Sequence, residues 1–95
     1  MINANLIISV STSRPDEFKV NSHMIKSDIH LLNVLERSID LPFYKTKLTD
    51  NIVKITGDAI PNTLCVLTCK NADDAKYFYD KVICRQQQLS YKNFQ

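Results

Sequence analysis

The segment FYKTKLTDNIVKIT, residues 43–56, constrains the fold more strongly than any other part of this 95-residue chain. Two runs that alternate apolar and polar residues flank Asp50-Asn51, a dipeptide typical of a two-residue hairpin turn. The turn fixes a register in which the opposing pairs are Thr49 and Ile52, Leu48 and Val53, Lys47 and Lys54, and Thr46 and Ile55. The segment therefore predicts two antiparallel strands with a defined pairing.

The same register gives this hairpin one apolar face and one basic face, because successive side chains on a strand point to opposite sides. The face expected to join the core carries Tyr44, Thr46, Leu48, Val53 and Ile55. The other face carries Lys45, Lys47 and Lys54, with Phe43 at its end. Lysines on an edge hairpin can protect it against unwanted strand pairing. A basic sheet face with an aromatic residue can also hold nucleic acid, although the net charge of +2 is small for that function.

Hydrophobic periodicity predicts the remaining elements. A strand is expected at Asn5–Thr12, a short second strand near Glu17–Asn21, a helix from its N-cap Ser27 towards Pro42, a strand at Thr63–Cys69, and a helix from Ala72 to about Gln88. The strand at Thr63–Cys69 is almost continuously apolar, so we expect it to be central and covered on both faces. Residues 89–95 are expected to fray as a tail.

The order β-(β)-α-β-β-β-α predicts an α+β fold, a small two-layer sandwich in which two helices pack on an antiparallel-leaning sheet of three to five strands. The length is typical of a single domain, residues 1–95. A ferredoxin-like arrangement is a neighbouring alternative. The pattern leaves the strand order open.

The chain has three cysteines, an odd number that argues against a disulfide framework and favours a reducing, cytoplasmic compartment. Cys65 and Cys69 share one strand face and are expected to be core, because free cysteine packs as a small hydrophobe. A zinc site would need both of them with Cys84 and one of the histidines, His23 or His30, and no CxxC pair supports it. We expect no metal and no cofactor, and no catalytic motif indicates an enzyme.

The helical wheel of the last helix separates a core stripe from an outer face. Ala75, Phe78, Tyr79, Val82 and Ile83 form the stripe, which Gln86 and Leu89 continue. The outer face carries Asp73, Tyr77, Asp80, Lys81, Cys84 and Gln88. Tyrosine is enriched at interface hot spots and a helix face is a common docking surface, so these six residues are the expected partner-binding site.

We therefore expect a small non-enzymatic binding protein that acts through contacts with another protein or with a second copy of itself. The nucleic-acid interpretation, through Lys45, Lys47, Lys54 and Phe43, is the alternative. High asparagine, lysine and isoleucine counts (8, 9 and 10) with one glycine favour an AT-rich genome, such as that of a bacteriophage, another virus or a low-GC bacterium. A phage- or virus-encoded modulator of a host protein is the setting we expect. No apolar run is long enough to span a membrane, and the N-terminus does not resemble a secretory signal, so we expect no membrane association.

Overall fold

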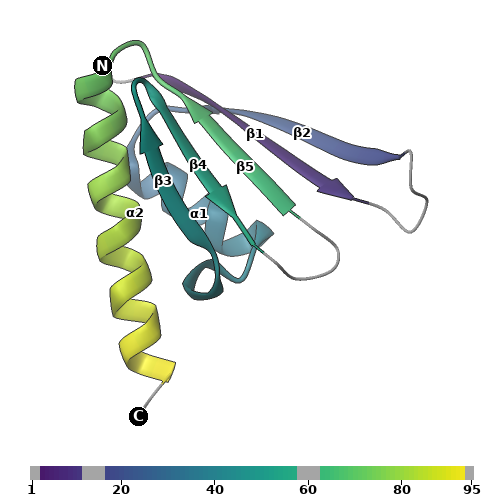
Figure 1. The fold of residues 1–95 in the computed structure, drawn as a ribbon, viewed down its shortest axis with the longest axis vertical. Coiled ribbons are helices and arrows are strands. Elements are labelled where there is room, and N and C mark those ends of the chain that lie inside the picture. Colours follow the sequence, from purple (N-terminus) through teal and green to yellow (C-terminus); the bar gives the residue numbers. More distant parts are fainter. Residues whose placement is uncertain (1–2, 12–16, 58–62, 94–95) are drawn as a thin grey trace.

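The structure, a computed structural model, describes residues 3–11, 17–57 and 63–93. The elements along the chain are β1 (Ala4–Ser11), β2 (Phe18–Ile25), α1 (Asp28–Ser38), the 3-10 turn η1 (Leu41–Phe43), β3 (Lys45–Thr49), β4 (Ile52–Thr56), β5 (Thr63–Thr68) and α2 (Ala72–Asn93). The strands form one five-stranded sheet in the order β2-β1-β5-β4-β3, antiparallel throughout (Figure 1). The predicted α+β class and order of elements are confirmed.

The sheet consists of two pieces that meet at its centre. The hairpin of β1 and β2 forms one piece, the meander of β3, β4 and β5 forms the other, and β1 pairs with β5. The chain passes from one edge strand, β2, to the other, β3, through α1 and η1. In the part of the chain that the structure describes, α2 follows the last strand and connects no two strands. The ferredoxin-like alternative, in which both helices connect strands, is therefore wrong.

The hairpin register predicted around Asp50-Asn51 is confirmed, including the direct opposition of Lys47 and Lys54. Asp50 takes a positive φ of 52°, which aspartate tolerates better than most side chains. The local turn signal was sufficient to predict the register, because a two-residue turn fixes which residues of the two strands lie opposite each other.

The hydrophobic core lies on one face of the sheet. Inward-facing strand residues such as Leu6, Ile55 and Leu67 pack with Leu35 of α1 and Phe78 of α2 in a single buried cluster. α2 packs against β3, β4 and η1, whereas α1 packs against β2 and α2. Figure 1 shows α1 behind the sheet and α2 along its β3 side. The molecule has two layers, one of strands and one of helices.

Both helices begin where their caps predict. The Ser27 hydroxyl accepts a hydrogen bond from the His30 amide at 3.1 Å, and the Asn71 side chain accepts one from the Asp74 amide at 2.8 Å. Each cap satisfies an amide that has no partner within its own helix.

Three predicted features differ in the structure. α1 ends at Ser38, four residues before Pro42, because the chain turns extended at Ile39, whose amide caps the helix by donating to the Leu35 carbonyl. α2 continues to Asn93, so most of the expected frayed tail is helical, while residues 94–95 lie outside the described ranges. β2 is longer than predicted and runs to Ile25.

β5 is the fourth correction. It is central, as predicted, but it is covered on one face only, since Cys65 and Leu67 are buried whereas Leu64 and Thr68 are exposed. Its apolar residues on both faces led us to expect two covering layers. In the ranges that the structure describes, the second face of the sheet is instead uncovered.

Candidate functional site

The predicted site on α2 is an exposed strip along the helix. All six of its residues are exposed: Asp73, Tyr77, Asp80, Lys81, Cys84 and Gln88. The Tyr77 ring contacts the buried ring of Phe78 edge-on, with 5.6 Å between centroids. The Lys81 ammonium lies 5.4 Å from the centroid of the Tyr77 ring. The strip therefore offers one aromatic side chain, which already contacts a cation, among polar neighbours.

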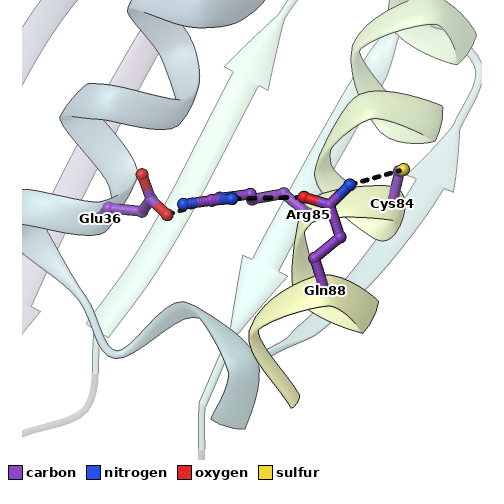
Figure 2. Close-up of polar contacts among 4 residues, drawn as sticks. All are labelled: Glu36, Cys84, Arg85 and Gln88. Carbon is purple, nitrogen blue, oxygen red and sulfur yellow. Dashed lines mark hydrogen bonds and ion pairs between the residues drawn. The ribbon is translucent and has the colours of Figure 1, made fainter. Parts of the chain in front are cut away.

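Polar side chains on the same helix are also engaged with one another. Figure 2 shows that Arg85 donates through Nε to Glu36 of α1 at 2.7 Å and through Nη1 to Gln88 at 3.2 Å. Gln88 in turn donates through Nε2 to the Cys84 sulfur at 3.9 Å. This chain of contacts holds α1 and α2 together. It also means that a partner on this strip would compete with contacts that are already made.

The three hairpin lysines lie on the opposite side of the molecule from the helices. Lys45, Lys47 and Lys54 are exposed, and Lys47 stands directly opposite Lys54 across the β3–β4 pair. Like charges so placed weaken the pair by a fraction of a kcal/mol, roughly 0.2–1. Phe43, which was expected at the end of this patch, is exposed in η1.

Sequence reasoning missed a larger surface, the side of the sheet that faces away from the helices. We call it the open face. Four of its large apolar side chains are exposed: Ile7 (40%), Val20 (59%), Met24 (52%) and Leu64 (40%). Val66 and Ile52, on the same face, are half-buried. Apolar residues gathered on one uncovered side of a sheet indicate an interaction surface better than isolated exposed residues do.

The strand register sorts the open face into an apolar half and a basic half. One row across the sheet is Ser22, Ile7, Val66, Lys54 and Lys47. The exposed apolar residues belong to β2, β1 and β5, whereas the lysines and the half-buried Ile52 belong to β3 and β4. None of the five strands contains an aspartate or glutamate. The open face therefore carries positive charge on β3 and β4, and its strands contain no negatively charged residue.

A signal for this surface was present in the sequence. Ile7 and Leu64 alternate with buried neighbours, as a strand with two apolar faces requires. The pattern shows that both faces are apolar, but it does not show whether a second layer exists to cover them. The described part of the chain has two helices for a five-stranded sheet, and both pack on the same face.

The cysteines and histidines of the described ranges do not gather into the zinc site considered from the sequence. Cys65 and Cys69 are buried, as predicted, and Cys84 is exposed on α2. Burial raises the pKa of the Cys65 thiol to about 12. Burial, and then the nearby charge of Asp74, raise the pKa of Cys69 to about 11. Among the residues in the described ranges, no three His, Cys, Asp or Glu side chains are arranged to hold a metal ion.

Within residues 3–11, 17–57 and 63–93, neither helix is long and apolar enough to cross a membrane. Comparison with protein-family models, with curated proteins and with solved structures finds no match to this chain.

Proposed function

We propose that this chain is a non-enzymatic binding domain that acts through protein–protein contacts, and that the open face is its principal contact surface. The observation that carries the proposal is the gathering of Ile7, Val20, Met24 and Leu64 on one uncovered side of the sheet. Burying a large apolar side chain fully contributes about 1.5–3 kcal/mol. These side chains are about half-exposed, so a partner that covers them gains the corresponding part of that contribution.

The charge distribution indicates the chemistry of the partner. Lys47 and Lys54 lie beside the apolar half, and the strands supply no carboxylate to neutralise them. A protein surface with apolar side chains next to aspartate or glutamate would complement both halves. Charge complementarity of this kind contributes mostly to specificity and association rate.

A second copy bound face to face does not fit this pattern. If the two-fold axis ran across the strands, the lysines of β3 and β4 would face the same lysines of the other copy. If it ran along the strands, they would face the apolar residues of β1 and β2. Both arrangements bury unpaired positive charge, which is unfavourable. The proposed occupant of the open face is therefore a different protein.

The outer strip of α2 is the competing protein-binding site. It carries Tyr77 and Cys84, but its charged neighbours already contact one another, as the ion pair of Lys76 with Asp80 illustrates. The open face offers more exposed large apolar residues than this strip does. That difference is why we place the principal contact on the sheet.

Nucleic-acid binding is the second candidate function, and the three lysines on one face favour it. Single-stranded nucleic acid is held mainly by stacking on aromatic side chains together with a basic groove. The exposed Phe43, the aromatic residue expected at this patch, belongs to η1 and not to the sheet. The alternative therefore rests mainly on the charge of the three lysines.

The test uses three immobilised baits in an extract of cells from the organism that encodes the protein or of its host. The baits are the wild type, an open-face variant (Ile7→Ser, Leu64→Ser) and a helix variant (Tyr77→Ala, Cys84→Ser). All substituted residues are half-exposed or exposed, so each bait should fold, which circular dichroism checks. We expect one or more proteins to be retained by the wild type and the helix variant and lost from the open-face variant.

Two further measurements extend this test. Binding of the retained protein should weaken when Lys47→Gln and Lys54→Gln are introduced into the wild-type bait, because the acidic groups of the retained protein then lose their partners. Short single- and double-stranded oligonucleotides should not bind at low salt. A partner lost only from the helix variant would move the site to α2. Oligonucleotide binding that falls steeply with salt would favour the second function.

A further inference from the structure

The two edges of the sheet differ in how they are protected. The edge strand β3 has five residues, two of which are lysines. The other edge strand, β2, has eight residues, no proline and one charged side chain, Lys19. Natural sheets protect exposed edges with short strands, lysines, proline or a covering element. β3 has two of these devices, whereas β2 has one lysine over a longer edge.

The outer backbone of β2 is available to pair with a further strand. β2 pairs with β1 alone in the described sheet, and Figure 1 shows it at the outer edge of the fan. On an antiparallel strand, alternate residues direct both their amide and their carbonyl to the same side. Every second residue of β2 therefore presents these groups outward. An added strand satisfies them with regular geometry, which is the basis of β-augmentation.

We propose that β2 pairs antiparallel with β2 of a second copy, centred on Ser22, so that two sheets join into one continuous sheet. This interface uses the edge of the sheet, shares only Val20 and Met24 with the exposed apolar residues of the open face, and does not rest on the function proposed above. A two-fold axis perpendicular to the sheet keeps the helices of both copies on one side. Such an isologous contact uses the same edge twice and closes after two copies.

The side chains of β2 select this register. A two-fold axis perpendicular to the sheet requires one residue to oppose its own copy, because paired side chains must share a face. Centring on Ser22 places Val20 of each copy opposite Met24 of the other copy. These two exposed apolar side chains then cover each other on the open-face side. Aliphatic cross-strand pairs of this kind stabilise antiparallel sheets.

Neighbouring registers pair the side chains less well. Centring on Asn21 places Phe18 opposite Met24, but it also places Val20 opposite the polar Ser22 and the two basic residues Lys19 and His23 opposite each other. Centring on Val20 places Lys19 opposite Asn21 and shortens the overlap. The Ser22 register leaves Lys19 opposite Ile25, without a like charge across the interface.

The test compares matched substitutions on the two edges. Ser22 and Thr49 are both exposed and both lie on the open-face side of an edge strand. In the proposed dimer, Ser22→Lys places two lysines directly opposite each other at the two-fold axis. Sedimentation equilibrium should show a dimer for the wild type and for Thr49→Lys, and a dissociation constant raised several-fold for Ser22→Lys.

A cross-linking experiment checks the register independently. In a Cys84→Ser background, Ser22→Cys should be joined to its own copy by a short bis-maleimide, and Thr49→Cys should not. The proposal is overturned if the wild type sediments as a monomer throughout, or if the two cysteine variants cross-link equally. It is also overturned if the dimer resists Ser22→Lys but is lost with Tyr77→Ala, since that result places self-association on α2.

Discussion

At the scale of single residues, burial decides what each cysteine can do. The Cys65 side chain lies wholly inside the core, and its raised pKa keeps it a neutral thiol. Cys69 is also buried, and its backbone exchanges two hydrogen bonds with Asn51 at 2.8 and 2.9 Å. Cys84 is exposed on α2. Because the thiolate is the reactive form, thiol chemistry of the folded protein should be confined to Cys84.

The corresponding prediction concerns thiol labelling. In native protein at pH 8, we expect a water-soluble aromatic disulfide reagent to modify one thiol per chain rapidly, and two more after unfolding. The absorbance of the released thiolate measures both phases. Cys84→Ser should remove the fast phase and leave the slow one unchanged. A fast phase that persists in this variant would show that Cys65 or Cys69 is accessible.

Gly57 shows a second effect of close packing at this scale. A Cβ atom at this position would lie 2.8 Å from the ring of Tyr44, closer than two carbon atoms tolerate. The positive φ recorded in the described ranges belongs to Asp50 and not to Gly57. The close approach of the Tyr44 ring, rather than the backbone conformation, therefore favours glycine at this position.

At the scale of elements, one buried polar side chain fixes how α2 lies against its neighbours. Gln86 donates through Nε2 to the carbonyls of Leu41 at 3.0 Å and Tyr44 at 2.9 Å. Its Oε1 accepts from the Thr46 hydroxyl at 2.9 Å. The side chain thus joins α2 to η1 and β3. The wheel placed Gln86 on the core stripe correctly, although its polar partners could not be predicted.

Replacing this side chain should loosen the docking of α2. Gln86→Ala leaves two carbonyls and one hydroxyl without their partner, and an unsatisfied buried polar group costs about 1–3 kcal/mol. We expect a loss of that size in the free energy of unfolding, measured by urea denaturation. The matched control is Gln87→Ala, one residue further along and exposed, which should change stability by less than about 0.5 kcal/mol. Equal effects would show that the three hydrogen bonds contribute little.

At the scale of the whole molecule, the core is one-sided. Two helices pack against one face of a five-stranded sheet, and nothing in the described ranges packs against the other. Neighbouring residues of β1 therefore differ sharply, since Ile8 is 3% exposed and Ile7 is 40% exposed. This asymmetry produces the open face and, with it, the proposed function.

The adjacent isoleucines provide a matched test of this architecture. Ile8→Ala creates a cavity in the core and should lower the free energy of unfolding by about 2–5 kcal/mol. Ile7→Ala removes a partly exposed side chain and should lower it by no more than about 1 kcal/mol. Urea denaturation at low protein concentration gives both values. If the losses were equal, Ile7 would be covered in solution and the one-sided core would be incorrect.

The six outer residues of α2 illustrate what a helical period can and cannot predict. Their exposure followed from the helical period and is confirmed. Their role as a binding site stays a prediction, because a wheel reports which side of a helix is polar and not what contacts it. The local patterns did not predict the open face for a different reason. It is assembled from strands distant in the chain, so no local window contains it.

Local patterns thus determined the hairpin register, both helix caps, the alternation of each strand and the burial of Cys65 and Cys69. These features depend on neighbours within a few residues, and backbone geometry is sufficient to set them. The strand order, the one-sided covering of β5 and the unequal edges were decided by tertiary structure. They depend on where α1 and α2 lie, and the free energy that places a helix comes from burying its apolar stripe against distant strands. A strand's period separates its two faces, but only packing decides which of them is covered.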